Sequence, residues 1–377
     1  MNKTAKRVEV FSSVGGAAFF EALLREWESM GWQVNCHHAL SEEEYRKPCG
    51  RLGRAALRWR MYAGFGWTCF NNARARRNDK LRVVTTNPFF APSLVRWATG
   101  SSGATIQLLY DLFPDALIHA GAVQKYSWIA RRCEMITRHA LRECAVTVFL
   151  GERLRRYAEE AYGSARRSVV IAVGADGARF REYPPTLMSA PVQVLYAGQM
   201  GRMHDVETLQ QTILAGVPSG LEFVFHANGI GYARLRKSCE TAQHCRWMGP
   251  LPDKDWSHVM RQAHVALVTM VWGAENVVMP SKTYSALVAG QAILAICPRQ
   301  SDLADLVFKH DCGWVVEPGD VEGLRAVLVK IVEDPEGLLE KRRRAFACGH
   351  SEYDVRVLAT KWVELFRDLE AEMGKTK

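Results

Sequence analysis

The feature that most constrains the fold is a repeated alternation of short runs rich in β-branched residues with longer segments of helical periodicity. Such alternation is typical of parallel sheets covered by helices. In the first half of the chain, helices are predicted at 17–30, 92–98 and 127–141. Strands are predicted between and around them at 8–12, 83–86, 105–110, 146–150 and 169–173.

The alternation is interrupted once by a proline-containing stretch, 183–191, and then begins again. Its second series predicts helices at 206–215, 232–241 and 281–289. The strands of that series are predicted at 192–196, 222–226, 265–269 and 292–296. With 377 residues, two domains are expected.

We therefore predict an α/β protein with two Rossmann-like parallel-sheet lobes that face a cleft. The predicted parts are an N-terminal lobe at 1–182, a hinge at 183–191, a C-terminal lobe at 192–350 and a terminal helical segment at 351–377. Leu358, Trp362, Leu365 and Phe366 share one helical face near the end, so this helix is expected to pack on the cleft or on the N-terminal lobe.

The positive charge of the chain is concentrated in one segment. Between Arg46 and Arg82 there are eleven Lys or Arg against one acid, Asp79, whereas the whole chain has a net charge of +9. Aromatic residues are interleaved with these charges, and this mixture suits contact with anionic lipid headgroups. The alternative is a solvated basic surface over core aromatics. Nucleic acid is a further alternative, but no RRM, KH or zinc-finger pattern accompanies the charge, so we expect no nucleic-acid partner.

Ten cysteines are scattered without a CxxC pair, which indicates reduced thiols and no metal site. The longest apolar run, 286–298, is interrupted by Gly290 and Gln291 and is shorter than the roughly 20 residues that cross a bilayer. The first residues lack the pattern of a signal peptide. We expect a cytoplasmic protein that crosses no membrane.

Two loops that enter predicted helices carry features of an anion site. In the first, YAGQMGRMHD at 196–205, Gly198 and Gly201 allow close backbone approach, and Arg202 and His204 offer positive charge. A plain glycine turn with a surface arginine is the alternative for this loop.

In the second loop, Glu275 precedes Pro280, Ser281 and Lys282, and Ser281 is placed to cap the helix. Lys282 in a first helical turn opposes the helix dipole unless an anion lies between them. If Lys282 simply points to water, the cost is only about 0.3–1 kcal/mol. Because both loops follow predicted strands of one sheet, a shared diphosphate is the better explanation.

Two further turns, around Gly229 and from Gly249 to Leu251, open at the same predicted sheet edge. Their backbone groups are suited to hold a base and a ribose.

The motifs YAGQMGRMHD at 196–205 and PSKTYSALVAG at 280–290 resemble the donor-site motifs of family 4 retaining glycosyltransferases, in particular those that build bacterial surface polysaccharides. TNP at 86–88, YDLFPD at 110–115 and AVGAD at 172–176 are similar to the same group. The resemblance implies a GT-B fold and a nucleotide-sugar donor, commonly a UDP-sugar, bound mainly by the second lobe. It also implies an acceptor on the first lobe, retention of anomeric configuration, and no essential metal or other cofactor.

The resemblance also implies roles for individual residues. Arg202 and Lys282 are expected to face the donor diphosphate, and Glu275 to lie near the donor sugar. Asp111 stands at the acceptor-side position where many relatives carry a catalytic histidine. These four form the expected catalytic set. The remaining expected donor contacts are Gly198, Gly201, His204, Gly229, Gly249, Leu251, Pro280, Ser281, Thr283 and Tyr284, and the expected acceptor-side residues are Gly15, Gly16 and Asn87.

The chain departs from that family at several positions. Val277 and Ser285 stand where many members carry a glutamate pair, and Gln199 and His204 replace a usual arginine and lysine. Arg202 and Lys282 must then supply more of the charge compensation. Truncating either one is expected to lower kcat by about 10²-fold or more, by analogy with single donors in oxyanion sites.

The resulting prediction is transfer of a sugar from a UDP-sugar to a polyprenyl-linked or other glycan acceptor in cell-surface polysaccharide synthesis. Peripheral association with the inner face of the plasma membrane, through residues 46–82, is part of this expectation. The alternatives are a nucleotide-sugar epimerase of the same fold, an inactive relative that only binds the donor, and a basic nucleic-acid or membrane-binding module without catalysis. Product analysis distinguishes them, because an epimerase needs no acceptor.

Overall fold

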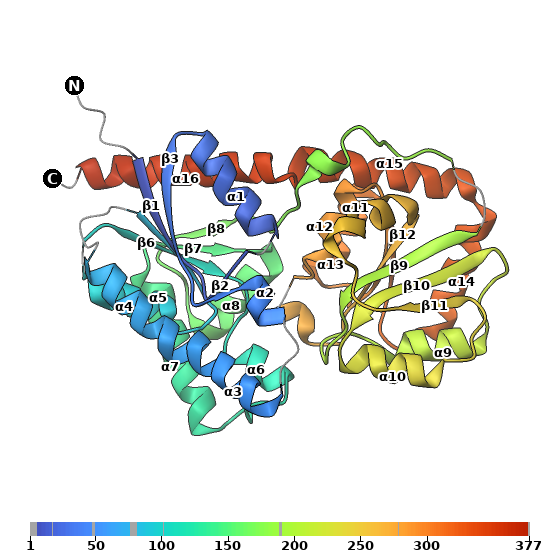
Figure 1. Ribbon diagram of the computed structural model, residues 1–377, viewed down its shortest axis with the longest axis horizontal. Coiled ribbons are helices and arrows are strands. Elements are labelled where there is room, and N and C mark those ends of the chain that lie inside the picture. Colours follow the sequence, from blue (N-terminus) through green and yellow to red (C-terminus); the bar gives the residue numbers. More distant parts are fainter. Residues whose placement is uncertain are drawn as a thin grey trace. The chain divides into compact units, whose positions relative to one another are not determined.

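The computed structural model describes residues 6–16, 18–46, 50–75, 81–100, 102–187, 191–277 and 279–375. The chain forms two compact units (Figure 1). One consists of Met1–Ala172 together with Val355–Lys377, and the other of Val173–Asp354.

Six parallel strands form the sheet of the first unit, in the order β3-β1-β5-β6-β7-β8. They are β1 (Lys6–Phe11), β3 (Trp32–His37), β5 (Leu81–Thr85), β6 (Ala104–Leu109), β7 (Val146–Phe149) and β8 (Ser168–Val170). A separate two-stranded ladder pairs β2 (Val14–Gly15) with β4 (Leu40–Ser41). Every residue of β5, β6 and β7 is buried, as expected for central strands covered on both faces, and the buried set includes polar residues such as Arg82, Gln107 and Thr147.

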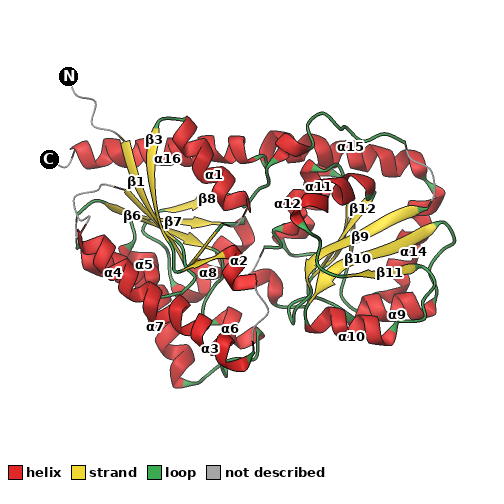
Figure 2. Cartoon of the chain, viewed as in Figure 1, coloured by secondary structure: helices red, strands yellow, loops and turns green. Residues whose placement is uncertain are grey.

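Helices cover both faces of this sheet (Figure 2). They are α1 (Ala18–Ser29), α2 (Glu42–Arg46), α3 (Arg51–Trp59), the π-helix η1 (Arg60–Gly64), α4 (Phe65–Ala75), α5 (Ala91–Thr99), α6 (Asp115–His119), α7 (Trp128–Glu143), α8 (Glu152–Tyr162) and α16 (Val355–Lys375).

The terminal helix α16 belongs to the first unit and packs on α1. The Phe366 ring lies 4.9 Å from that of Trp27 and 5.0 Å from that of Trp32, measured between centroids, and Trp362 lies 5.4 Å from Trp27. Burying aromatic side chains of this size contributes about 1.5–3 kcal/mol each. Residues 351–354, which we predicted together with this helix, lie in the second unit, where Ala175 forms a β-bridge with Asp354.

The second unit contains another six-stranded parallel sheet, in the order β11-β10-β9-β12-β13-β14. Its strands are β9 (Val192–Gln199), β10 (Leu221–Asn228), β11 (Cys245–Met248), β12 (Val265–Thr269), β13 (Ala292–Ile296) and β14 (Gly313–Val316). Its helices are the 3-10 helices η2 (Gly177–Arg179) and η3 (Ala274–Asn276), α9 (Glu207–Ala215), α10 (Ile230–Ser238), α11 (Asp253–Gln262), α12 (Lys282–Val288), α13 (Asp302–His310), α14 (Val321–Glu333) and α15 (Pro335–Glu352). The two series of strands predicted from sequence thus form two separate parallel sheets.

The segment before β9 is held by the second unit. The Arg342 guanidinium donates to the carbonyl of Thr186 at 3.0 Å, Arg181 pairs with the buried Asp354 at 2.9 Å, and the rings of Phe180 and Trp256 lie 5.3 Å apart. The units therefore divide after Ala172 and not in the predicted hinge at 183–191. Of that predicted hinge, 188–190 lie outside the described residues.

Candidate active site

The ends of neighbouring strands bring the two predicted anion loops together in the second unit. The Met200 amide, directly after β9, donates to the Asn228 carbonyl at the end of β10 at 2.8 Å. The Val271 amide, after β12, donates to the Met203 carbonyl at 3.0 Å. The loop that contains Gly198, Gly201 and Arg202 is thus fixed between the loops that follow β10 and β12, at the carboxyl edge of the sheet where open α/β sheets bind ligands.

Two glycines of this edge are required by the backbone. Gly198 has a φ of +120° and Gly229 a φ of +103°. A Cβ on Gly229 would lie 2.5 Å from the Met200 carbonyl oxygen. Gly249, by contrast, has open space where a Cβ would be, and it lies exposed in the loop after β11, with Leu251 half-buried beyond it.

Lys282 is the most unusual group of the site. Its Nζ lies 3.6 Å from the centroid of the Tyr196 ring and is buried, although the remainder of the side chain is partly exposed. Across the described ranges no hydrogen-bond acceptor reaches this ammonium. Burial lowers its pKa from 10.5 to about 7. The contact with Tyr196 compensates only part of the lost hydration, because a cation–π contact contributes about 0.5–2 kcal/mol.

His204 was expected to contribute positive charge, but its surroundings in the ligand-free protein favour the neutral imidazole. Its Nδ1 accepts a hydrogen bond from the Gly201 amide at 3.0 Å, which leaves the proton on Nε2. Burial and the nearby charge of Lys282 lower the pKa of His204 to about 4. At neutral pH, the imidazole therefore stabilises the glycine turn and offers one neutral N–H donor. Arg202 is exposed in the same turn.

Glu275 lies in η3, directly after Gly273 and Ala274. Its Oε2 is buried with no hydrogen-bond partner in the described part of the chain, and its Oε1 has a 3.4 Å contact from the side-chain Nδ2 of Asn276. The hydroxyls of Thr269 and Thr283, which lie at the two ends of the β12–α12 connection, are likewise buried without a partner. An unsatisfied buried polar atom costs about 1–3 kcal/mol, so a ligand that reaches any of these atoms gains from completing its hydrogen bonds.

The start of α12 differs from the prediction in two details. Ser281 occupies the N-cap position, but its hydroxyl makes no capping bond, and the Pro280 carbonyl accepts from the Thr283 amide at 3.1 Å. Tyr284, expected to contact the donor, is fully buried, with its ring 5.0 Å from that of Tyr353. It packs in the core because it faces α15 and not the open end of the helix.

The predicted acceptor-side residues lie at the carboxyl edge of the first sheet. The Thr86 hydroxyl donates to the Asp111 carbonyl at 3.2 Å and accepts from the Tyr110 amide at 3.1 Å, which joins the loops after β5 and β6 next to Asn87. Burial raises the pKa of the Asp111 carboxyl from 3.8 to about 6.

The predicted glycine pair follows β1. Gly15 is in β2, where a Cβ would lie 2.9 Å from the His38 ring. The Gly16 amide donates to Glu21 at 2.9 Å. Gly15, Gly16, Asn87 and Asp111 belong to the first unit, whereas the predicted donor residues all belong to the second.

The basic segment forms the consecutive helices α3, η1 and α4. Arg54, Arg58 and Arg74 are exposed there, whereas Arg82 is completely buried on β5 and donates to the Ser102 carbonyl at 2.8 Å. Arg82 is therefore not part of a basic surface, a correction to the predicted patch 46–82. Lys47, Arg76, Arg77, Asp79 and Lys80 lie outside the described residues.

The sequence did not single out Tyr196, whose ring supports the Lys282 ammonium, or Thr269. An aromatic residue at a strand end before a glycine turn was the available signal for Tyr196. The described residues contain no group of three or more His, Cys, Asp or Glu placed to hold a metal ion. They also contain no helix with the length and apolar content needed to span a bilayer.

Comparison with known proteins places this geometry among glycosyltransferases. No protein-family model matches the chain. It is 24% identical over 333 residues to the probable glycosyltransferase WbjE of Pseudomonas aeruginosa, covering 84% of this chain and 82% of that protein.

Two solved structures extend the comparison. Sucrose-phosphate synthase from Thermosynechococcus elongatus superposes with a TM-score of 0.75 at 14% identity, over 97% of this chain and all of that one. Anabaena HepE in complex with UDP-glucose superposes with a TM-score of 0.67 at 13% identity, over 96% and 99% of the two chains. The chain has the GT-B fold, and its relatives and structural neighbours are glycosyltransferases of that type.

Proposed function

We propose that this protein is a retaining glycosyltransferase of family 4 that transfers a hexose from a UDP-sugar to a polyprenyl-linked or other glycan acceptor in cell-surface polysaccharide synthesis. The observation that carries the proposal is the buried Lys282 ammonium, which has no acceptor in the described residues. It lies at the sheet edge beside the Gly198–Gly201 turn, and a diphosphate is an anion of the right charge for it.

In this proposal the diphosphate leaves from the anomeric carbon while Lys282 and Arg202 compensate its growing negative charge. The bond from C1 to the phosphate oxygen breaks, and a bond from C1 to the acceptor oxygen forms on the same face of the sugar. The acceptor hydroxyl gives its proton to the departing phosphate oxygen. We assign no metal or other cofactor to the reaction, because fixed cations and amides aimed at a developing charge are sufficient for stabilisation of this kind.

Glu275 and Asp111 are assigned to the two sugars. The Glu275 oxygen that has no partner in the described residues accepts a hydrogen bond from a hydroxyl of the transferred sugar. The His204 Nε2–H gives a hydrogen bond to the bound nucleotide sugar. Asp111 accepts a hydrogen bond from a hydroxyl of the acceptor sugar next to the attacking one and thereby orients the acceptor. Its pKa of about 6 keeps the carboxyl mainly ionised at neutral pH, as this role requires.

The test is a panel of UDP- and GDP-sugars assayed for hydrolysis and for thermal stabilisation of the protein. One UDP-sugar is expected to raise the melting temperature and to be hydrolysed slowly without acceptor. NMR of the initial transfer product then reports its anomeric configuration, which we expect to be retained. An inverted product, or epimerisation of the donor in the absence of any acceptor, would refute the proposed reaction.

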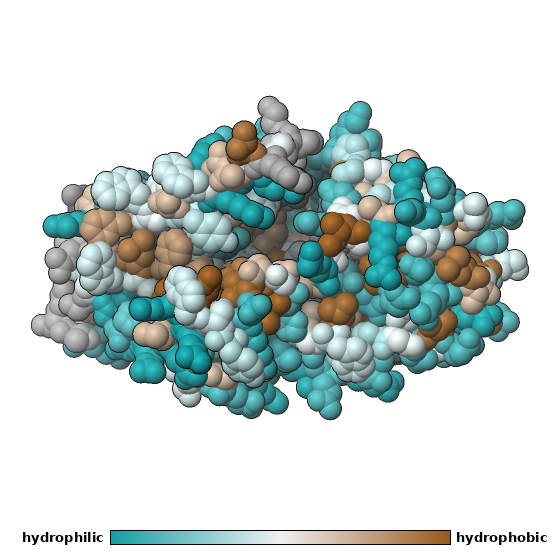
Figure 3. Space-filling view, turned by 90° about the horizontal axis from the view of Figure 1, so that it is seen from below, coloured by the Kyte–Doolittle hydropathy of each residue, from teal (hydrophilic) through white to brown (hydrophobic). Residues whose placement is uncertain are grey.

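The helices α3 to α4 support a second part of the proposal, docking to the cytoplasmic face of an anionic membrane. Trp59 and Trp67 are 67% and 68% exposed, Leu52 is 88% exposed, and the exposed Arg54 and Arg58 lie on the same helices. Hydrophobic and hydrophilic side chains are mixed on the face of the first unit that carries these helices (Figure 3). Each basic residue near an anionic surface contributes roughly 1 kcal/mol, and the indoles suit the interface.

Vesicle sedimentation tests this docking. The protein is expected to bind phosphatidylglycerol vesicles at low salt, and Arg54→Glu with Arg58→Glu to abolish most of that binding. Lys330→Glu, at an exposed position of α14 in the second unit, is the control and is expected to bind like the unmodified protein. Equal binding to neutral phosphatidylcholine vesicles, or no effect of the double substitution, contradicts electrostatic docking.

A further inference from the structure

The side chain of Lys282 lies where a permanent positive charge is unfavourable. Its Nζ is buried, has no hydrogen-bond acceptor in the described part of the chain and lies 3.6 Å from the centroid of the Tyr196 ring. A cation that loses its hydration without gaining an anionic partner is stabilised by releasing its proton. The ligand-free site therefore favours the neutral amine, and burial lowers the pKa of this lysine to about 7.

The titratable groups near Lys282 do not act as its counter-ion. Tyr196 on β9 and His204 in the turn that follows stay neutral at neutral pH, because burial raises the pKa of the tyrosine and lowers that of the histidine to about 4. Arg202, in the same turn, adds a second positive charge. Glu275 in η3 gives no hydrogen bond acceptor to the Nζ atom.

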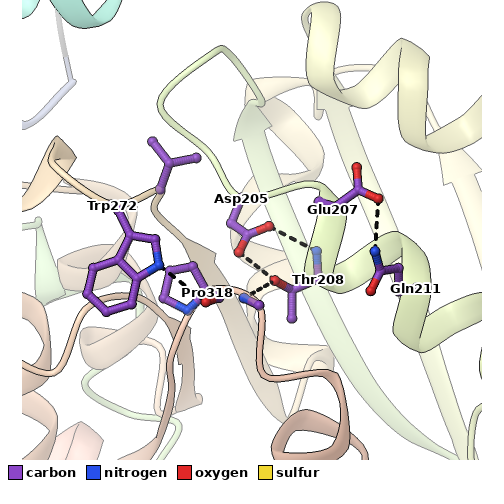
Figure 4. A pocket seen from close by; sticks show the side chains of 8 residues that line it. Asp205, Glu207, Thr208, Gln211, Trp272 and Pro318 are labelled. Atoms are coloured by element: carbon purple, nitrogen blue, oxygen red, sulfur yellow. Dashed lines mark hydrogen bonds between the residues drawn. The ribbon is translucent and has the colours of Figure 1, made fainter.

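The acids that follow the turn are engaged by other groups (Figure 4). The Asp205 carboxylate accepts hydrogen bonds from the Thr208 amide at 3.0 Å and from the Thr208 hydroxyl at 2.6 Å. Glu207 accepts from the Gln211 side-chain amide at 3.0 Å and pairs with Arg234 at 2.5 Å. Both carboxylates thus stabilise α9 and its neighbours, and neither supplies the missing negative charge.

The elements packed against α12 supply no counter-charge either. The sequences of β12 and β13 contain no titratable side chain. From α15, Arg342 donates to the Gly290 carbonyl at 3.1 Å and the His350 Nε2–H donates to the Val288 carbonyl at 3.1 Å. Both contacts are at the C-terminal end of α12, whereas Lys282 begins this helix. A negative charge beside Lys282 must therefore come from a ligand.

We propose that binding of a nucleotide diphosphate is coupled to the uptake of one proton by Lys282, so that the site carries a full ammonium only while it is occupied. This inference rests on the proposed function, because it takes the diphosphate to lie beside Lys282. The proton comes from the solvent and forms an N–H bond on Nζ, and the transfer of the sugar itself is unchanged. The consequence is a donor affinity that decreases as the pH rises above neutrality.

The size of the effect follows from the two protonation states. A diphosphate beside Nζ favours the charged form, so in the complex the pKa of Lys282 is expected to return towards its ordinary value of 10.5. From a pKa of about 7 in the ligand-free site, binding takes up about half a proton at pH 7 and about 0.9 proton at pH 8. The affinity is then highest below pH 7 and falls by about 50-fold between pH 7 and pH 9.

Calorimetric titration of the full chain with UDP measures this uptake directly. At pH 8, the apparent binding enthalpy is compared in Tris and in HEPES, because the difference between buffers of unlike ionisation enthalpy gives the number of protons bound. The terminal phosphate of UDP loses its second proton near about pH 6, so the nucleotide itself exchanges few protons at this pH. An uptake of about 0.9 proton is expected for the unmodified protein.

Substitutions separate the titration of Lys282 from its charge. Lys282→Arg keeps a positive charge that does not titrate below about pH 12, so UDP is expected to bind without proton uptake and with nearly the same Kd at pH 7 and pH 9. His204→Gln is expected to bind UDP more weakly but with the same uptake, which excludes the imidazole as the proton acceptor. Lys237→Met, at an exposed position of α10, is the matched control and is expected to behave like the unmodified protein.

The outcomes distinguish this proposal from the proposed function. If the unmodified protein binds UDP with no proton uptake and an unchanged Kd between pH 7 and pH 9, the coupling is refuted while the donor assignment stands. The coupling is also refuted if the Lys282→Arg or Lys282→Met protein still takes up a proton on binding. If UDP fails to bind at any pH, the donor assignment itself is wrong, and the coupling falls with it.

Discussion

Replacing Lys282 by methionine tests two effects of its buried ammonium separately. One is the cost of that charge to the stability of the ligand-free protein, and the other is its contribution to nucleotide binding. Methionine keeps much of the unbranched side-chain volume but carries no ammonium. In the ligand-free protein that ammonium has no acceptor among the described residues, and burial lowers its pKa from 10.5 to about 7. We therefore expect Lys282→Met to stabilise the ligand-free second unit and at the same time to weaken nucleotide binding.

The magnitude follows from the pKa. Each tenfold change in proton affinity corresponds to about 1.4 kcal/mol, so a decrease from 10.5 to about 7 sets an upper limit of about 5 kcal/mol. The cation–π contact with Tyr196 recovers up to about 2 kcal/mol of this cost, so the expected gain at pH 7 is about 3 kcal/mol.

The sign of the pH dependence is a separate check. Between pH 7 and pH 10 the unfolded chain binds more protons at this lysine than the folded chain does, so the stability of the unmodified protein rises with pH across that window. The methionine variant lacks this rise. Its advantage is therefore expected to be largest at pH 7 and to shrink towards pH 10.

Hydrogen exchange of the β9 and β12 amides at pH 7 and pH 9 measures this difference within the second unit alone. Calorimetric titration with UDP measures the second effect, a loss of affinity of about tenfold to 100-fold, as expected for removal of a charge-assisted hydrogen bond. Lys237→Met, at an exposed position of α10, is the control for both measurements. The reasoning is refuted if Lys282→Met destabilises the second unit equally at both pH values and still binds UDP normally.

Three further predictions concern single residues. Asp111→Asn is expected to remove an acidic limb near pH 6 from the profile of kcat/KM, because the ionised carboxyl, needed for the acceptor, is lost as the pH falls through its pKa of about 6; an unchanged profile in a transfer assay contradicts its role. His204→Ala leaves the Gly201 amide without its acceptor and is expected to weaken UDP binding by about tenfold, measured by calorimetry. An unchanged Kd would show that the Gly198–Gly201 turn does not contribute to UDP binding. Gly229→Ala places a Cβ against the Met200 carbonyl oxygen at a residue with positive φ, and it is expected to destabilise the second unit by about 1–3 kcal/mol. If chemical denaturation shows an unchanged free energy of unfolding, the predicted backbone strain is absent.

Much of the fold was predictable because most central strands are short runs rich in apolar and β-branched residues. The sequence of β13 is continuously apolar, that of β12 is apolar up to Thr269, and both strands are entirely buried. The strands β3, β11 and β14 were missed. All three are sheet edges, β3 (Trp32–His37) in the first sheet and β11 (Cys245–Met248) and β14 (Gly313–Val316) in the second, and partial exposure gives them a mixed composition that resembles a loop. The boundary after Ala172 was also missed, because contacts such as that from Arg342 to Thr186 join residues far apart in sequence.

The candidate site was predictable only in part, because local patterns report residue types and not their surroundings. The glycine turns and the lysine at a helix start were visible as motifs. The neutrality of His204 depends on burial and on the charge of Lys282, and the burial of Arg82 depends on its position in a central strand. Neither environment is encoded within a few neighbouring residues. Roles assigned to the loop residues remain predictions until the donor is identified.

The return of α16 to the first unit has a consequence for how the protein is made. Trp362 and Phe366 emerge from the ribosome after the whole second unit, yet these side chains cover Trp27, which emerges before it. During synthesis the second unit, which is continuous, can therefore be complete while the first still exposes an indole and a strip of α1. A nascent chain of this kind offers a transient binding surface for chaperones until α16 has been synthesised and packs on α1.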